Sequence, residues 1–416
     1  MNRANQRYKL IIGVLAFILA LIFNVEFSLP MVAVVALVAV TALFLSLDDL
    51  VCYVMCLVPF TWFTPGYMVL ILYIILLLKT RNFRMMQILP TLMLIFLEFA
   101  HLSLYDFTIE WPQVLSFCSF LALFFYLLFY QPAKDVSPSR YVKMFCFGLA
   151  ISLSLSSYIL TKFYDIELLL SGALRSGVID ELETGLEEVN VLNANSAAYF
   201  AITLLACLLV GYKRLNMNKC LHICLLIVAI ASGLLSFSRT WIIVCVLMFA
   251  LYFIYEKAQN KLYLGLLLLV GLAVAISYGW IDMIMSTFMG RFELDNMETA
   301  GSRTVYFSVF NDFWTSQFGY VIFGTGVTFY KLVTNIPFSI HNSIQQIYVC
   351  QGLLGLSIYI WAAFYYKKHF CSSGNSFVYY IPFIAVLAFS LSLQFLLPQF
   401  LMFPLVGAVY VMRMRE

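Results

Sequence analysis

Long apolar runs separated by short polar connections make up almost the whole chain. A helix of roughly 20 apolar residues can cross the ~30 Å hydrocarbon core of a bilayer. Fourteen runs are candidates: Leu10–Val25, Met31–Leu47, Val51–Trp62, Tyr67–Leu78, Ile88–Leu104, Val114–Tyr130, Tyr141–Leu160, Val191–Tyr212, Leu221–Leu235, Trp241–Tyr255, Leu262–Trp280, Asn342–Tyr366, Phe377–Leu397 and Met402–Met412. The third and fourth are short, and a re-entrant hairpin would reduce the number to twelve. The pattern predicts an all-α polytopic integral membrane protein with about 12–14 transmembrane helices.

Basic residues fall in alternate connections, which sets the expected orientation. An even number of helices places both termini on one side, and Lys and Arg concentrate in cytoplasmic connections. One set of connections holds 18 of the 24 basic residues: Arg3, Arg7, Lys9, Lys79, Arg81, Arg84, Lys134, Arg140, Lys143, Lys213, Arg214, Lys219, Lys257, Lys261, Lys367, Lys368, Arg413 and Arg415. We therefore expect both termini to be cytoplasmic and most acidic residues to lie on the opposite, outer face.

Two outer loops stand out, at 161–190 and 281–340. The second is far longer than a connection between adjacent helices needs to be, and long ordered loops usually carry function. Within it, the apolar spacing of Thr304–Phe318 predicts a short amphipathic helix on the membrane surface. There is no fixed-period repeat and no flexible linker. We expect one transmembrane domain over 1–416, with the loop 281–340 capping its outer end.

Composition narrows the class of protein further. The chain is 63% hydrophobic and 11% charged, whereas soluble domains have about 25% charged residues. A net charge of +3 gives no reason to expect nucleic acid as a partner. Most of the ten cysteines lie in apolar runs; Cys220 and Cys224 flank His222 without further ligands, so we expect neither disulfides nor a metal. The N-terminal run has no small-residue cleavage site after it and is interpreted as a retained helix.

Six basic residues remain for the outer face, where cations run against the usual charge bias and suggest an anionic ligand: Lys162, Arg175, Arg239, Arg291, Arg303 and Lys331. Arg239 follows an abrupt break between two apolar runs. It is either a functional charge at membrane depth or an interfacial side chain that reaches the headgroups. Arg303 would sit in the first turn of the amphipathic helix, where helix N–H groups and a guanidinium together suit phosphate; a solvated loop arginine is the alternative.

His341 opens the apolar run Asn342–Tyr366 at its outer end. There a histidine can titrate near neutral pH and accept a proton, although a hydrogen-bonded interfacial residue would have the same pattern. Gly352 and Gly355 would let a neighbouring helix approach this span closely. His101 lies near the outer end of another span without polar neighbours, and we expect its replacement to be neutral.

Three further features have two interpretations each. Gly324 and Gly326 could bring backbone close to a ligand, or form a plain turn. The acidic run at 180–188 could bind a metal, but we favour a solvated loop face. Glu98 lies inside a span, where it pairs with a polar neighbour or titrates, and the sequence assigns it no role.

Three motifs in the region 191–360 resemble the O-antigen ligase and polymerase superfamily of bacterial surface-polysaccharide enzymes. His341-Asn342, then nine residues, then Gly352-Leu353-Leu354-Gly355 fits the ligase-type signature. The stretch Asn193–Ala198 looks like the Asn-rich opening of the family's membrane core, and Ser238-Arg239-Thr240 looks like its helix break. The order of these motifs also follows the family. The N-terminal half is similar only in hydropathy.

The resemblance implies transfer of a glycan from an undecaprenyl-diphosphate carrier to an acceptor hydroxyl, at the outer face of the cytoplasmic membrane. In this interpretation Arg239 and Arg303 stabilise the leaving diphosphate without a metal or other cofactor, and His341 takes the proton from the attacking hydroxyl. Substrate contacts are expected from Arg291, Asn342, Gly324, Gly326 and Lys331. The partners would be the lipid-linked donor, a glycan or lipid-linked acceptor, membrane lipids and other polysaccharide-assembly proteins.

Two activities remain open within the family. A polymerase adds repeat units to a lipid-linked chain, whereas a ligase moves the finished chain to lipid A core or another acceptor. We favour the polymerase, because both share these motifs and polymerases occur in surface-polysaccharide loci of diverse bacteria. A transporter or flippase is the alternative from another class. It should carry polar residues at midplane depth along several spans and show half-to-half symmetry, which the sequence lacks.

Overall fold

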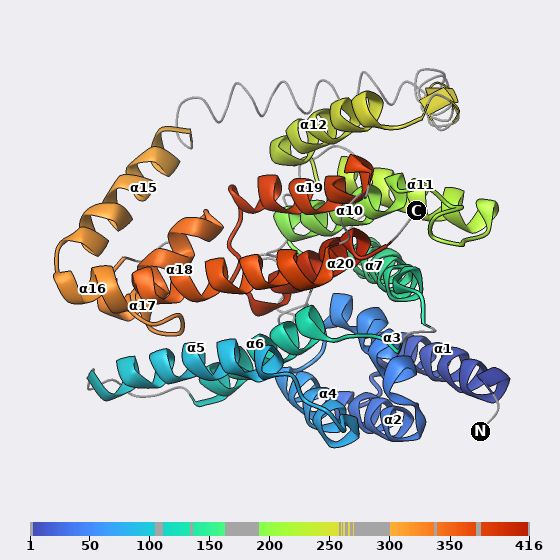
Figure 1. Cartoon of the computed structure of the whole chain (residues 1–416), viewed down its shortest axis with the longest axis horizontal. Helices are drawn as coiled ribbons and strands as arrows, with labels where there is room; N and C mark the ends of the chain where they lie inside the picture. The colour runs from blue at the N-terminus through green and yellow to red at the C-terminus, as the bar shows by residue number, and fades with distance from the viewer. Residues whose placement is uncertain are drawn as a thin grey trace.

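A computed structural model of the chain describes residues 3–104, 111–133, 136–162, 191–257, 300–336, 339–371 and 376–414, and a few positions between 259 and 269. Within these ranges every regular element is a helix, which confirms the all-α prediction. Most helices run along the long axis of the molecule, and both termini lie at one end of it (Figure 1).

The first part of the chain contributes α1 (Arg3–Phe27), α2 (Met31–Phe44), α3 (Leu47–Leu57), η1 (Val58–Phe60), α4 (Gly66–Lys79), α5 (Met85–Leu104), α6 (Trp111–Phe129) and α7 (Pro138–Thr161). The rest contributes α10 (Ala194–Leu209), α11 (Lys219–Leu235), α12 (Arg239–Tyr255), α15 (Ala300–Thr315), α16 (Phe318–Phe323), α17 (Tyr330–Thr334), α18 (Ser343–Phe370), η2 (Phe377–Tyr380), α19 (Ile381–Ser390), η3 (Gln399–Met402) and α20 (Phe403–Met412). The outer loop from 163 to 190 and all of 270–299 lie outside the described residues, so most of the predicted span Leu262–Trp280 and the first part of the loop 281–340 are not described.

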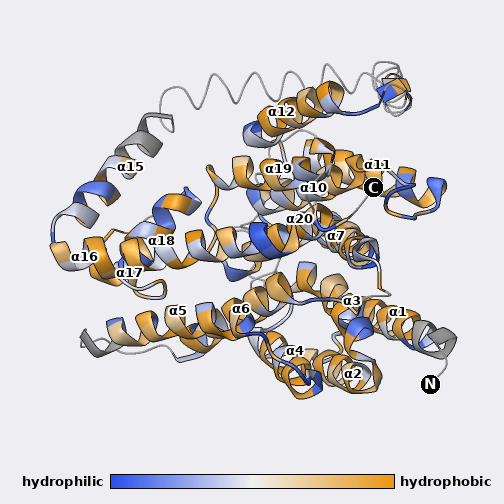
Figure 2. Ribbon diagram, in the orientation of Figure 1, coloured by the Kyte–Doolittle hydropathy of each residue, from blue (hydrophilic) through white to orange (hydrophobic). Residues whose placement is uncertain are grey.

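Four of the described helices are long and apolar enough to cross a membrane: Tyr8–Phe27, Trp111–Phe129, Pro138–Thr161 and Ser343–Phe370. Eight shorter apolar helices of 10–17 residues lie among the described residues. Apolar residues cover most of the helix surfaces, and polar residues gather mainly at helix ends and connections (Figure 2). The structure is therefore that of an all-α membrane protein.

Close backbone approach builds the core. Helix α3 and η1 are buried almost throughout, in contact with α7. A Cβ at Gly148 of α7 would clash with the carbonyl of Cys56, so only glycine allows this approach. Trp62, just after η1, donates to Ser152 of α7 at 2.7 Å. The short α3–η1 segment is thus enclosed by protein, which a re-entrant segment requires.

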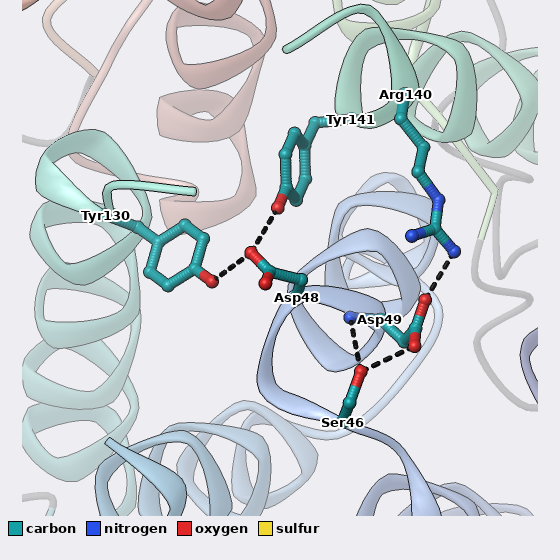
Figure 3. Close-up of polar contacts among 6 residues, drawn as sticks. All are labelled: Ser46, Asp48, Asp49, Tyr130, Arg140 and Tyr141. Atoms are coloured by element: carbon teal, nitrogen blue, oxygen red, sulfur yellow. Dashed lines mark hydrogen bonds and ion pairs between the residues drawn. The ribbon is translucent and has the colours of Figure 1, made fainter. Parts of the chain in front are cut away.

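A polar cluster joins three helices at the end of the bundle that holds the termini (Figure 3). Asp48 of α3 accepts hydrogen bonds from the hydroxyls of Tyr130 at 2.6 Å and Tyr141 at 2.8 Å. Its neighbour Asp49 forms an ion pair with Arg140 of α7. Burial, and then the bond to Asp48, raise the pKa of Tyr130 well above its usual value, so the phenol stays a donor.

One predicted span is shorter than the sequence indicates. The apolar run Phe377–Leu397 is helical only as far as Ser390. Beyond it, the backbone N–H groups of Phe395 and Leu396 donate to the side-chain oxygen of Gln346 at 2.8 and 2.7 Å. Since a buried N–H group needs a partner but not a helical one, the glutamine replaces the missing helix bonds. The non-helical segment at 391–398 therefore lies against α18.

Candidate active site at the start of α18

Asn342 fixes the first turn of α18. Its side-chain oxygen accepts from the N–H of Gln345 at 3.0 Å, the usual role of an N-cap asparagine. Its side-chain nitrogen donates to the carbonyl of Leu391, also at 3.0 Å. Asn342, the residue after His341, therefore has two structural roles: it caps α18 and bonds this helix to the segment after α19.

Further bonds from the same turns hold this segment in place. Ser343 donates to the carbonyl of Leu393 at 2.7 Å, and the buried Gln346 accepts the two N–H groups described above. Thr240, at the start of α12, accepts a hydrogen bond from Ser392 at 3.1 Å. The segment at 391–396 thus connects the start of α12 to the start of α18.

Helix α15 lies on the other side of His341. Gln345 donates from its side chain to the carbonyl of Phe307 at 2.8 Å and to the side chain of Asn311 at 3.3 Å. The rings of Trp314 and Tyr348 lie 4.6 Å apart. A helix therefore occupies most of the predicted stretch and packs against α18, while its amphipathic position on the membrane surface stays a prediction.

A cavity of about 300 Å³ lies between these elements, at the end of the bundle opposite the termini (Figure 1). Its lining residues are Tyr306, Phe307, Phe310, Ser339, Ile340, His341, Asn342, Gln345, Leu391 and Ser392. Tyr306, Phe307 and Phe310 are aromatic, Ile340 and Leu391 are aliphatic, and the other five lining residues are polar. His341 is exposed, so its ring is accessible to a ligand in this space.

Arg239 is the first residue of α12 and is partly buried. The connection from α11 is tight because the ring of Trp241 packs on Gly233, where a side chain would clash. The N-cap residue Ser238 makes no side-chain capping bond. The positive end of the helix dipole and a guanidinium at one point create positive potential. The Thr240–Ser392 bond places this helix start beside the cavity wall.

The other predicted cations are distributed differently. Arg303 lies in the first turn of α15, three and four positions before the cavity residues Tyr306 and Phe307. Lys331 is an exposed residue of α17 and does not line the cavity. Arg291 and the acidic run at 180–188 lie outside the described residues. His341 and Asn342 thus line one cavity. Arg239 does not line it, but its neighbour Thr240 bonds the lining residue Ser392, and the helix of Arg303 supplies part of the lining.

Gly324 and Gly326 also lie away from the cavity. Both have positive φ, 75° and 86°, and a Cβ on Gly324 would clash with the backbone of Cys350 and Gln351. Gly352, with a φ of 64°, breaks α18 and lies against the backbone of Ile322 in α16. This confirms the close approach expected at Gly352. At Gly355 the nearest atoms belong to Gln351 of the same helix. A substrate-binding role for Gly324 and Gly326 stays a prediction.

The interpretation of His101 as a residue without polar neighbours is wrong. Its ring nitrogen Nε2 lies 3.0 Å from the carbonyl of Gly324, and the side chain is buried. Glu98, one turn earlier, binds the backbone of the same loop. The sequence missed these contacts because the partner residues are more than 220 positions away.

Sequence reasoning also missed Ser392, Gln345 and Ser339 as cavity residues. Ser392 lay inside a run interpreted as a continuous span; Pro398, soon after it, was the available signal of a break.

Among the described residues, no three His, Cys, Asp or Glu side chains gather as metal ligands. With one imidazole, hydroxyl and amide groups and nearby guanidinium positions, the arrangement suits acid–base and anion-binding chemistry.

Comparisons of the chain with protein-family models, curated proteins and solved structures give no match in any of the three.

Proposed function

We propose that this protein is a glycosyltransferase that polymerises oligosaccharide repeat units carried on undecaprenyl diphosphate, as the resemblance to the O-antigen ligase and polymerase superfamily implies. One observation carries the proposal. The cavity beside α18 has His341 on its wall and the start of α12, with Arg239, behind Ser392. A proton acceptor and a phosphate-binding group are the two elements that such a transfer requires.

The lining suits a sugar attached to an apolar carrier. Tyr306 and Phe307 offer aromatic rings that can stack on a pyranose, while Asn342, Ser392 and Gln345 offer hydrogen bonds to hydroxyl groups. Exposed apolar side chains on α15 and α16 that do not line the cavity, such as Val309 and Phe318, would meet the acyl region of the bilayer. The polyprenyl chain can then stay in lipid while its head enters the cavity.

The chemistry is a single displacement. The acceptor hydroxyl gives its proton to His341 as its oxygen forms a bond to the anomeric carbon. The bond from that carbon to the diphosphate oxygen breaks, and the diphosphate leaves with the electron pair. Arg239 and Arg303 neutralise the charge that develops on the leaving oxygen. Attack opposite the leaving group inverts the anomeric centre.

The same proposal includes the membrane arrangement. We place the basic connections and both termini in the cytoplasm, with 12–14 helices crossing the cytoplasmic membrane and the cavity at its outer face. In support, the termini and the cavity lie at opposite ends of the bundle (Figure 1). The lipid-linked donor would reach the cavity from the outer leaflet.

Gel analysis of surface glycan and lipid-linked intermediates in a deletion strain tests the proposal. Loss of a polymerase leaves single repeat units on the carrier or on the surface acceptor. Long polymer accumulating on undecaprenyl diphosphate with a bare surface would instead identify a ligase. Unpolymerised units trapped in the inner leaflet, inaccessible to added enzymes in intact spheroplasts, would identify a flippase and overturn both.

A further inference from the structure

Helix α5 carries two buried polar side chains one turn apart, Glu98 and His101, which are 1% and 2% exposed. Residues at i and i+3 of a helix share a face. A buried carboxylate inside an apolar helix is costly unless hydrogen bonds replace its lost hydration. The reason for keeping both groups there must therefore be found in what they contact.

Both oxygens of Glu98 bind the backbone of one loop. The N–H of Val327 donates to Oε2 at 2.8 Å, and the N–H of Thr328 donates to Oε1 at 2.9 Å. The hydroxyl of Thr328 adds a third bond to Oε1 at 2.5 Å. All three partners donate, an arrangement that a carboxylate satisfies and an amide side chain cannot.

His101 holds the same loop at its other end. Its Nε2 lies 3.0 Å from the carbonyl of Gly324, and a Cβ on Gly326 would touch its Cβ at 3.3 Å. From the opposite side, α18 accepts hydrogen bonds from Thr325 and Gly326, through the carbonyls of Val349 at 3.0 Å and Cys350 at 2.8 Å. Residues 324–328 are thus fixed between α5 and α18.

This loop leads directly to the cavity wall. The buried Tyr330 follows it by two residues, and its ring lies 6.3 Å from that of Phe310. Its phenol interacts with Ser339 and with the backbone of Ile340. Phe310, Ser339 and Ile340 all line the cavity, next to His341. A shift of the loop would therefore move the lining residues Phe310, Ser339 and Ile340, which lie next to His341.

We infer that Glu98 and His101 are positioning residues, which seat residues 324–328 on α18 and so hold the cavity wall in the geometry that the reaction needs. The effect on turnover rests on the proposed function, whereas the seating of the loop does not. Neither side chain lines the cavity, so neither is expected to touch the substrate.

The native thiol of Cys350 reports on the loop directly, because it is fully buried at the point where the loop docks. The experiment measures N-ethylmaleimide labelling of each cysteine in the purified full-length protein by peptide mass spectrometry. Glu98→Gln should raise the labelling rate of Cys350 about 10-fold or more through local opening. Cys56 and Cys146, which are buried in α3 and α7, should keep their slow labelling.

Thr328→Val removes only one of the three bonds and should give a smaller, equally selective increase. Thr91→Val is the matched control, because Thr91 is buried on the same helix and its hydroxyl has no hydrogen-bond partner within the described part of the chain. It should leave all three rates unchanged. An unchanged Cys350 in Glu98→Gln, or equal increases at Cys350, Cys56 and Cys146, would overturn the inference.

Turnover supplies the second measurement. Glu98→Gln should lower kcat for glycan transfer by about 10- to 100-fold with little change in donor KM, because the donor-binding cations remain. The double variant with Thr328→Val should lose no more than the stronger single variant, since both substitutions weaken the same contact between Glu98 and the loop. Additive losses would overturn the link between that contact and the site. If the wild-type protein transfers no glycan, the proposed function fails while the labelling still tests the seating.

Discussion

Ser392 donates a hydrogen bond to Thr240 at 3.1 Å, and this contact joins a wall of the cavity to the start of α12. The two residues are 152 positions apart. Arg239 precedes Thr240 directly, so the contact ties its helix start to the cavity that His341 also lines. The arginine and the histidine of the proposed mechanism thus belong to one structural unit.

Two substitutions of Arg239 test whether turnover requires only a positive charge or the planar guanidinium itself. Arg239→Ala should lower turnover by roughly 10²-fold, the usual cost of losing a group that stabilises developing charge. Arg239→Lys should recover little, because an ammonium cannot bind phosphate in a bidentate manner. The measurement is the transfer rate of purified protein in the presence of EDTA. Loss of wild-type activity on chelation, with recovery on adding a divalent ion, would contradict the metal-free mechanism.

The tight packing at Gly324 predicts a large stability effect. Gly324→Ala adds a Cβ that clashes with α18 and forces a residue with a side chain into positive φ. We expect a loss of about 1–3 kcal/mol from the backbone conformation alone. Gly319→Ala is the control, since a Cβ there meets open space. Thermal unfolding in detergent compares them; equal melting temperatures would show that α18 does not constrain the loop.

The ion pair between Arg140 and Asp49 should stabilise the end of the bundle that holds the termini. Asp49 is buried, so Arg140→Ala leaves its carboxylate without its cation. Hydrogen bonds to charged groups contribute about 1.5–3 kcal/mol each, and we expect a loss of that size. The exposed Arg81, replaced by alanine, should change stability by less than about 0.5 kcal/mol. If Arg140→Ala left the stability unchanged, the hydrogen bonds from Tyr130 and Tyr141 to Asp48 would account for the stability of the cluster instead.

Orientation can be tested with two exposed positions, Lys257 after α12 and Asp312 on α15. In intact spheroplasts, an impermeant maleimide should label Asp312→Cys and leave Lys257→Cys unlabelled until the membrane is opened. This follows from the bias of basic residues to the cytoplasm. The reverse pattern would put the cavity on the cytoplasmic side, away from the proposed donor leaflet.

The sequence predicted the features that depend on local pattern. The apolar runs gave the all-α class, the apolar spacing after Arg303 gave α15, and the run that begins at Asn342 gave α18. Features that depend on contacts between distant residues could not be predicted. The hydrophobic periodicity indicates neither the bond from the N–H of Phe395 to Gln346 nor the place of Ser392 in the cavity lining. Glu98 was recognisable as unusual, but its partner Thr328 was not.

The central claim is that His341 accepts the proton of the acceptor hydroxyl, and the most direct test is the transfer rate of purified His341→Ala with a lipid-linked repeat unit. Because a positioned proton acceptor contributes roughly 10²- to 10⁴-fold, the variant should lose that much in kcat while it still binds the donor. His369→Ala, an exposed histidine near the opposite end of α18, should retain full activity. A fully active His341→Ala at normal expression would contradict the account.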